Sequence, residues 1–282
     1  MNAWISALGR NDEIIKTTLP GAFFVWALWV SPATALPGSA PECPPSRIDE
    51  YAVVAGVFDG DTLRLSDGRK LRLIGINTPE LGRDGEPNDP LARRAQQALI
   101  RLAGPGTRLG LRYGRERHDR YGRLLAHLFL TDGTNIQAQL LADGWGVALV
   151  VPPNLWQRAC YAGRETDARR RRAGIWAVAH YQPRQAANLP PGIRGFHIVR
   201  GRVQRVGNSR SAVWLNLSAD FAVRIPRKDL VYFIGSDPLA LTGKELFARG
   251  WIYKRKGELR MTVRHPASLG LEQAPIPGID RP

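Results

Sequence analysis

The chain has 282 residues, of which 44% are hydrophobic and 23% charged, with 29 Gly and 21 Pro. This ordinary globular composition excludes wholesale disorder, a collagen-like repeat and a coiled coil. Basic residues outnumber acidic ones by 40 to 25, and the net charge is +15. Because the guanidinium of Arg matches phosphate oxygens bidentately, this mostly Arg-derived charge favours a polyanionic partner. The alternative is an Arg content that only reflects a GC-rich genome.

The first fifty residues predict an export signal. Residues 1–35 contain an apolar run from Gly21 to Val30, followed by Ala33-Thr34-Ala35. A spanning helix needs roughly 20 apolar residues, whereas a shorter run before a small-x-small site is typical of a cleaved secretory signal. We therefore expect a periplasmic or secreted protein. The alternative is an inner-membrane anchor formed by residues 19–30. The Pro-rich segment 36–49 is interpreted as a linker.

The chain has two cysteines, Cys43 and Cys160. In an oxidising compartment they are the one intramolecular pair that the sequence offers. A bridge between them would tie the N-terminal linker to the predicted helix near 155–173. Two unpaired thiols remain the alternative.

From residue 51 the pattern predicts three strands in a meander, at 51–58, 62–65 and 70–76, with tight turns between them. A helix at 90–103, strands at 107–113 and 123–130, and helices at 134–143 and 154–173 follow. Meandering strands interleaved with helices predict an α+β domain over residues 50–182, built on a closed barrel.

A second linker is predicted at 183–194, where Pro183, Pro190 and Pro191 flank a polar stretch. Strands are expected at 196–206, 211–217, 220–225, 248–256 and 258–264, with a helical interruption near 227–247. They predict a small β-rich domain over 195–272, compatible with an OB-like barrel, and a tail at 273–282. Residues 194–265 hold 15 basic and 5 acidic side chains, against 20 and 14 in residues 50–182. The second domain is therefore the more basic of the two.

Three short stretches carry residues suited to attack on a phosphodiester. They are Asp59-Gly60-Asp61-Thr62 in a turn, the strand end from Arg72 to Glu80, and Asp119-Arg120-Tyr121-Gly122-Arg123. Each stretch alone is a common feature of hairpins or of solvated strands. Only their combination predicts a site.

Hard oxygen ligands for Ca²⁺ are offered by Asp61, by the amide of Asn77 and by a nearby main-chain carbonyl. Glu80 is placed to orient and deprotonate a water molecule. Arg72 and Arg123 are placed to hold the phosphate and to stabilise charge that develops on its oxygens. Strand alternation predicts that Arg72, Ile74 and Ile76 share one face.

In their order and spacing these motifs resemble the thermonuclease (staphylococcal-nuclease-like) family over residues 50–180. The resemblance implies an OB-like five-stranded barrel with three helices and Ca²⁺-dependent cleavage of DNA and RNA to 5′-hydroxyl and 3′-phosphate ends. By this resemblance Asp61 and Asn77 would bind calcium through their side chains, and Thr78 through its main-chain carbonyl. Arg72, Glu80 and Arg123 would form the catalytic set, with Asp59, Asp119 and Tyr121 as candidate support.

Two positions depart from the family pattern. Family members usually carry Asp where this chain has Asn77, so a lower calcium affinity is expected. The segment Val150-Val151-Pro152 also lacks the two tyrosines that stack on a nucleotide base in the best-known member of the family.

The sequence thus predicts an exported, calcium-dependent, sugar-nonspecific nuclease acting on single-stranded or flexible DNA and RNA, with a second basic module that raises substrate affinity. One alternative is a nucleic-acid-binding protein without hydrolysis. Another is an envelope interaction protein whose second domain binds an acidic polymer. The aromatic residues interleaved with Arg in that domain suit either core packing or stacking on a single strand. They are Trp214, Tyr232, Trp251 and Tyr253.

Overall fold

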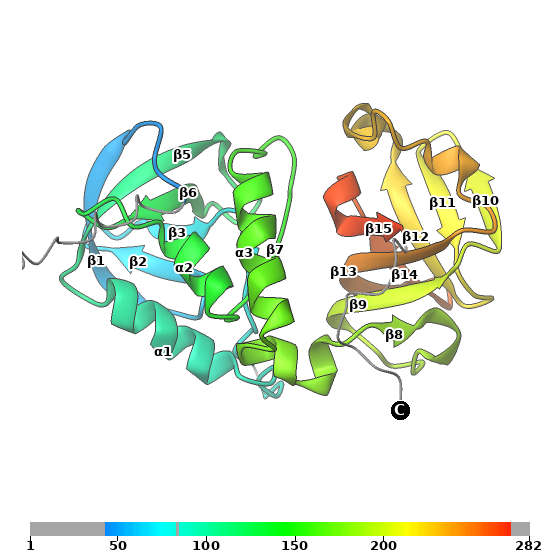
Figure 1. Ribbon diagram of the computed structural model, residues 1–282, viewed down its shortest axis with the longest axis horizontal. Helices are drawn as coiled ribbons and strands as arrows, with labels where there is room; N and C mark the ends of the chain where they lie inside the picture. The colour runs from blue at the N-terminus through cyan, green and yellow to red at the C-terminus, as the bar shows by residue number, and fades with distance from the viewer. Residues whose placement is uncertain (1–42, 83–84, 272–282) are drawn as a thin grey trace, which may run out of the picture. The chain divides into compact units, whose positions relative to one another are not determined.

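The computed structural model describes residues 43–82 and 85–271 (Figure 1). The predicted export signal at 1–35, its alternative as an anchor and the tail at 273–282 lie outside these residues. Within them, no helix has the length and apolar character needed to cross a membrane.

The first domain is a closed barrel of five strands, connected in the order β1-β2-β3-β6-β5. The strands are β1 (Glu50–Val57), β2 (Thr62–Leu65), β3 (Lys70–Leu73), β5 (Arg108–His118) and β6 (Leu124–Phe129). One half of β1 pairs with β5 and the other half with β2, with a register shift between Val54 and Gly56. β3 and β6 run parallel, and the remaining pairs are antiparallel. The predicted OB-like barrel is confirmed.

Alternating apolar residues fill this barrel, because successive side chains of a strand point to opposite faces. Leu63 and Leu65 of β2 and Leu71 and Leu73 of β3 lie in one buried cluster. Three helices accompany the barrel: α1 (Ala92–Ala103), α2 (Ile136–Ala142) and α3 (Arg158–Arg170). α2 lies between α1 and α3 (Figure 1).

The predicted strand over 70–76 is interrupted at Ile74 and Gly75. Gly75 has a φ of +85°, and a Cβ atom there would collide with the ring of Tyr161. The chain resumes as β4 (Ile76–Asn77), which pairs with β7 (Val147–Ala148). Because of this break, Ile76 joins the core with Leu71 and Leu73. The expectation that Ile76 shares the face of Arg72 is therefore wrong.

The last helix of the first domain begins at Arg158 rather than at residue 154. The preceding residues form a turn in which Val151 and Asn154 make a β-bridge. Cys160 lies in the first turn of α3 and forms a disulfide with Cys43, whose side chain is buried. The segment 36–49, interpreted as a linker, is thus attached to the barrel domain through Cys43.

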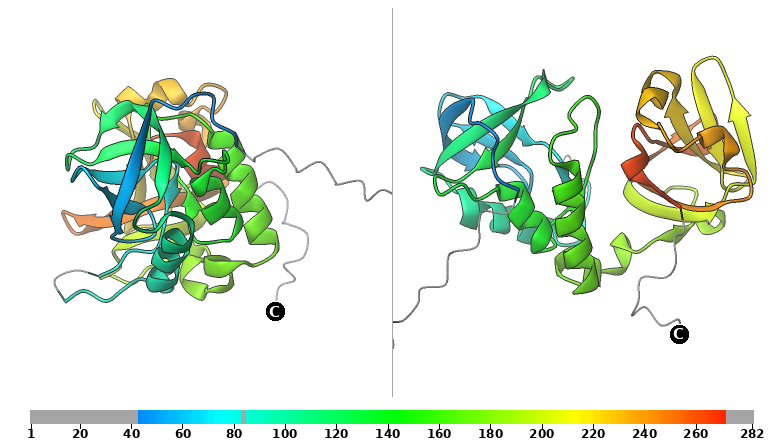
Figure 2. Two further views of the ribbon diagram at one scale, coloured as in Figure 1. Left: turned by 90° about the vertical axis from the view of Figure 1, so that its left-hand side faces the viewer. Right: turned by 45° about the horizontal axis from the view of Figure 1, so that its top comes forward.

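The second domain is a curved sheet in the order β10-β11-β12-β14-β13-β9-β8, with β15 on β13 (Figure 2, right). The strands are β8 (Arg184–Gln185), β9 (Gly195–Arg202), β10 (Arg205–Asn208), β11 (Ala212–Asn216), β12 (Phe221–Pro226), β13 (Glu245–Arg255), β14 (Glu258–Thr262) and β15 (Leu269–Leu271). Short 3₁₀ helices complete the chain: η1 (Gly174–Ala177), η2 (Ala179–Tyr181), η3 (Ala186–Asn188), η4 (Arg227–Tyr232), η5 (Pro238–Ala240) and η6 (Pro266–Ser268).

The pairings of the second domain repeat those of the first. β9 pairs with β13, and β10, which follows after two residues, pairs with β11. β9 and β10 therefore act as the two halves of one bent strand that pairs with both sides of the sheet, as β1 does in the barrel. β12 and β14 are parallel, as are β3 and β6. This connectivity is that of an OB-like barrel.

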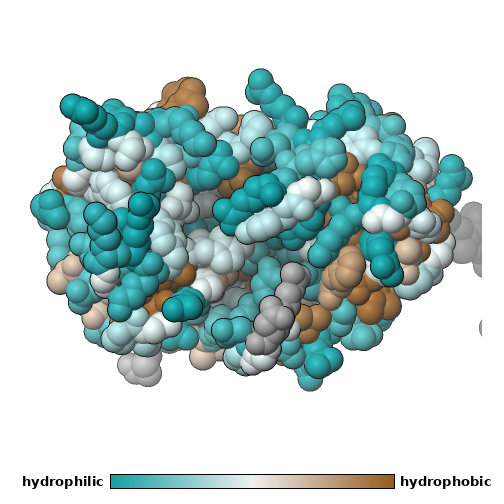
Figure 3. Space-filling view, turned by 180° about the vertical axis from the view of Figure 1, so that it is seen from behind, coloured by the Kyte–Doolittle hydropathy of each residue, from teal (hydrophilic) through white to brown (hydrophobic). Residues whose placement is uncertain are grey.

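The segment at 183–194, interpreted as a linker, contains β8 and η3, and β8 pairs with β9. Among the large hydrophobic side chains of the described residues, Ile234 is the most exposed. On the side drawn in Figure 3, hydrophobic residues form small patches separated by hydrophilic ones.

Candidate active site

The candidate site lies where the turn between β1 and β2 meets the end of β4. Asp59 and Asp61 are both buried in this turn, with 3% and 1% exposure. The Oδ1 of Asp59 accepts a hydrogen bond from the Asp61 N–H at 3.1 Å. Gly60 is required between them, because a Cβ atom there would lie 2.6 Å from the Thr78 hydroxyl. The sequence therefore places two carboxylates close to Thr78, which directly follows β4.

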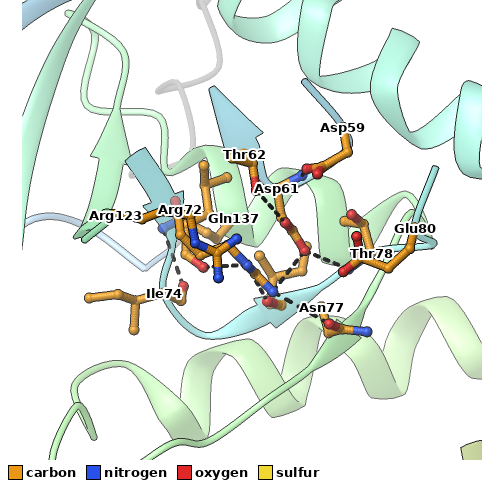
Figure 4. Close-up of polar contacts among 12 residues, drawn as sticks. Asp59, Asp61, Thr62, Arg72, Ile74, Asn77, Thr78, Glu80, Arg123 and Gln137 are labelled. Carbon is orange, nitrogen blue, oxygen red and sulfur yellow. Dashed lines mark hydrogen bonds and ion pairs between the residues drawn. The ribbon is translucent and has the colours of Figure 1, made fainter. Parts of the chain in front are cut away.

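Asp61 is the centre of the cluster (Figure 4). Its carboxylate lies 2.9 Å from the Arg72 Nη2 and accepts a hydrogen bond from the Thr78 N–H at 2.9 Å. The Thr62 hydroxyl donates a further bond at 3.1 Å. Figure 4 shows Arg72 on one side of Asp61, and Thr78 and Glu80 on the other.

Burial raises the pKa of Asp61 well above its usual range. The charge of Arg72 and the Thr78 N–H lower this pKa, and the carboxylates of Asp59 and Glu80 raise it further. The net effect is upward, because a charged carboxylate loses its hydration in this pocket of acidic groups. A cation beside Asp61 would offset that loss.

Arg72 is fixed by four acceptors, of which the first is the Asp61 carboxylate. β2 and β3 place it opposite Thr62. Its Nη1 donates to the main-chain oxygens of Leu73 and Ile76 at 2.7 and 2.9 Å, and its Nη2 reaches the Asn77 Oδ1 at 3.4 Å. The side chain is 11% exposed. The break in the strand at Gly75 creates this arrangement, since it turns the Ile76 carbonyl towards Arg72.

Asn77 and Thr78 are also buried, with 4% and 2% exposure. Among residues 43–82 and 85–271, no three His, Cys, Asp or Glu side chains come together as a metal site. A cation would therefore rely on the Asp61 carboxylate together with neutral oxygens from Asn77 and Thr78. A buried carboxylate with a raised pKa beside hard neutral oxygens fits a Ca²⁺ ion.

Arg123 lies near the start of β6 and is held by Asp119. Its Nε donates to the Asp119 Oδ2 at 2.7 Å, and the N–H groups of Tyr121 and Arg123 donate to the Oδ1. Burial raises the pKa of Asp119, but these hydrogen bonds outweigh it, so the pKa lies below its usual range. The Tyr121 ring is 67% exposed, with the Arg123 guanidinium 5.5 Å from its centroid.

The parallel register of β3 and β6 places Arg72 opposite Leu125. Leu124 and Ala126 point into the core, so Leu125 and Arg123 point to the other face. Arg72 and Arg123 consequently lie on the same outer face of neighbouring strands.

Glu80 follows the buried pair Asn77 and Thr78 and is exposed. Its backbone N–H donates to the Asp89 Oδ2 at 3.0 Å. Figure 4 shows the Glu80 side chain on the same side of Asp61 as Thr78. The structure thus brings Asp59, Asp61, Arg72, Asn77, Thr78 and Glu80 to one end of the barrel. Val151, in the segment that lacks the two tyrosines of the best-known family member, is 40% exposed.

Sequence reasoning missed two buried residues that support the site. Gln137 is fully buried and donates to the carbonyls of Ile74 and Ala126 at 3.3 and 3.2 Å, so it fixes the strand break. Glu165 accepts a bond from the Ala148 N–H at 2.7 Å and pairs with Arg249 of the second domain at 2.7 Å. No local pattern identifies either residue, because both act through partners distant in the sequence.

Comparison with known proteins identifies relatives of the first domain. A family model described as Staphylococcal nuclease homologue matches residues 70–178. A thermonuclease from Staphylococcus intermedius is 32% identical over 130 residues, which cover 45% of this chain and 76% of the relative. A thermonuclease from Staphylococcus hyicus is 30% identical over 131 residues, with coverage of 45% and 75%. Endonuclease YncB from Bacillus subtilis (strain 168) is 30% identical over 136 residues, with coverage of 46% and 64%.

The family match contains Arg72, Asn77, Glu80 and Arg123 and ends before the second domain. It begins at residue 70, after the turn that carries Asp59 and Asp61. On the barrel, on this cluster and on these matches, the chain belongs to the staphylococcal nuclease homologue family.

Proposed function

We propose that the barrel domain is a calcium-dependent nuclease that hydrolyses DNA and RNA to 5′-hydroxyl and 3′-phosphate ends. The observation that carries the proposal is the cluster in which Arg72 and the Thr78 N–H contact the buried Asp61, while Arg72 also contacts Asn77. The relatives named thermonuclease and endonuclease support the same reaction class.

In this proposal Asp61, the Asn77 amide oxygen and the Thr78 carbonyl hold the calcium ion. When bound, the ion supplies positive charge for the phosphate oxygens. Arg72 and Arg123, on one face of the barrel, hold the phosphate and stabilise the charge that develops on its oxygens. Asp119 positions Arg123, because its carboxylate accepts hydrogen bonds from both the backbone N–H and the Nε of Arg123.

Glu80 acts as the general base. Glu80 lies at an exposed position after the buried Asn77 and Thr78, and its carboxylate deprotonates a water molecule as the water attacks phosphorus. The bond between phosphorus and the 5′ oxygen breaks, the 5′ oxygen takes up a proton from solvent to become a hydroxyl, and the phosphate stays on the 3′ side. Tyr121 offers an exposed ring beside Arg123 for the substrate.

The test is incubation of the full chain with single-stranded DNA and with RNA, in calcium or in EDTA. We expect cleavage that requires calcium and products whose 5′ ends accept phosphate from a polynucleotide kinase without prior phosphatase treatment. Intact strands in calcium would overturn the proposal. Cleavage that persists in EDTA would overturn the metal requirement.

Asn77 favours a second candidate function, a binding protein without hydrolysis. An amide in place of a carboxylate gives one negative charge fewer for a dication. Retardation of intact DNA in a gel, equal in calcium and in EDTA, would support this candidate against the nuclease.

We also propose that the chain is exported to the periplasm or the medium. The disulfide between Cys43 and Cys160 supports this, because such bonds persist in oxidising compartments. Fractionation of cells that express the full chain tests the proposal. Recovery in the cytoplasm would contradict it, and recovery in the inner membrane would favour the anchor.

A further inference from the structure

We propose that the second domain binds a single strand of nucleic acid on one outer face of its sheet. We name this surface the Trp214 face. It is formed by Arg205, Gly207, Trp214, Arg224, Tyr253 and Arg260, from strands β10, β11, β12, β13 and β14. The second domain lies outside the family match, which ends at residue 178. Binding to the Trp214 face can be measured without hydrolysis.

Strand register sets the position of Trp214. Its neighbours Val213 and Leu215 point into the core, so the indole points outward. Trp214 lies opposite Arg224 of β12 on one side and opposite Gly207 of β10 on the other. Gly207 has no side chain, so this position of β10 places no side chain against the indole.

The outer face continues across the next two strands of the sheet, β14 and β13. Arg260 of β14 lies opposite Ala222 of β12 and opposite Tyr253 of β13. The core residues Leu259 and Met261 flank Arg260, which therefore points outward with Trp214. On this outer face Arg224 of β12 and Arg260 of β14 thus lie between Trp214 of β11 and Tyr253 of β13.

Close contacts hold the indole in place. The Arg260 guanidinium lies 4.8 Å from the Trp214 ring centroid, and that of Arg224 lies 5.9 Å away. The indole N–H donates to the Ser209 hydroxyl at 3.3 Å. A ring fixed in this way stacks on a base at a lower cost in conformational entropy than a mobile one.

Basic loops extend the Trp214 face. The β13–β14 hairpin carries Lys254, Arg255 and Lys256, all exposed, and the turn after β10 carries the exposed Arg210. Glu258 is a carboxylate in this region, and Arg260 neutralises it at 2.8 Å. The surface therefore presents positive charge beyond its own ion pairs.

This chemistry fits a single strand better than a duplex or a protein. Aromatic rings stack on unpaired bases, and neighbouring cations bind the phosphates between them. In OB-like barrels, the face of the second and third strands binds oligonucleotides. β11 and β12 occupy those places here, and they carry Trp214 and Arg224.

The test measures binding of a fluorescein-labelled 12-nucleotide dT strand to the full chain in EDTA by anisotropy. Since stacking is worth about 1–3 kcal/mol per base, Trp214→Ala should weaken binding about tenfold. Trp214→Phe keeps a ring and should stay within about threefold of the wild type. Arg224→Ala should reduce the slope of log affinity against log salt by about 0.7. Lys228→Ala removes an exposed charge outside the Trp214 face and serves as the control.

Unchanged binding by Trp214→Ala would overturn the proposal. Equal affinity for a duplex of the same length would overturn the single-strand assignment. Competition by polyglutamate as effective as that by unlabelled dT would show that charge alone acts, as expected of a domain that binds an acidic polymer. Trp214→Ala should hydrolyse a dinucleotide in calcium at the wild-type rate. If the wild type hydrolyses nothing, the proposed function fails while the binding result stands.

Discussion

The guanidinium of Arg72 lies 2.9 Å from the carboxylate of Asp61, which is 1% exposed. This buried ion pair joins β3 to the turn before β2, so it connects the residue proposed to hold phosphate with the residue proposed to hold calcium. Breaking such a pair from one side leaves an uncompensated buried charge. The geometry of both residues therefore depends on the pair.

Arg72→Lys should lower kcat at least about 100-fold. A single ammonium group cannot reproduce the bonds that Nη1 makes to two carbonyls while Nη2 contacts Asp61 and Asn77. The measurement is the rate on single-stranded DNA at saturating calcium. Arg64→Lys, an exposed position on β2, is the matched control and should keep the full rate. A fully active Arg72→Lys variant would remove Arg72 from the catalytic set.

Asn77→Asp should lower the calcium concentration for half-maximal rate about tenfold, because a second carboxylate strengthens a hard-cation site. The measurement is a calcium titration of rate, paired with a calcium titration of the thermal midpoint. Asn188→Asp adds the same charge at an exposed position outside the site and should have no effect. An unchanged requirement in Asn77→Asp would show that residue 77 is not a ligand.

Two buried histidines should make the fold acid-sensitive. Burial lowers the pKa of His127 from 6.5 to about 3, and burial lowers that of His197 to about 4. Below pH 6.5 these two histidines are therefore protonated in the unfolded chain and neutral in the folded chain. The free energy of unfolding should be constant with respect to these groups above about pH 7 and should fall as the pH drops, by about 1.4 kcal/mol per pH unit for each histidine.

Urea unfolding at pH 7, 6 and 5 measures this slope. His127→Gln should reduce the slope of the unfolding free energy against pH by the contribution of one proton. His118→Gln, at an exposed position, should leave the slope unchanged. Equal slopes in the wild type and in His127→Gln would contradict the assignment.

The disulfide should contribute strongly to stability. It joins residues 117 positions apart, and a loop of that length is worth roughly 4–5 kcal/mol in the chain-entropy model. Replacing both Cys43 and Cys160 by Ala should lower the thermal midpoint by about 10 °C. A reducing agent should lower the midpoint of the wild type similarly and should leave the double variant unchanged. A reductant-insensitive wild type would contradict the role of the bond.

Much of the barrel could be predicted because its signals are local. The turn at Ser66-Asp67-Gly68 and the alternating leucines on both sides of it define β2 and β3 without any knowledge of the rest of the chain. The site motifs could also be found, because their residues lie within short stretches at fixed spacing. The structure places the turn that carries Asp61 against Arg72 and Thr78.

The features of the fold and of the site that were not predicted from the sequence depend on contacts between distant segments. The break at Gly75 follows from the Tyr161 ring of α3, which no pattern in residues 70–77 reveals. The buried Glu165 depends on Arg249, which lies 84 residues further along the chain. The predicted strand over 196–206 divides into β9 and β10 because its two halves pair with different strands. Hydrophobic alternation is similar in a straight and in a bent strand, so it does not reveal the bend.

The central claim is that Glu80 deprotonates the attacking water at a calcium-dependent site. Its most direct test compares hydrolysis of single-stranded DNA in calcium by the wild type, by Glu80→Gln and by Glu86→Gln, an exposed carboxylate of the same loop region. The account predicts a fall of about 100-fold to 10,000-fold for Glu80→Gln, with unchanged DNA binding and a normal rate for Glu86→Gln. A Glu80→Gln variant as active as the wild type would contradict it.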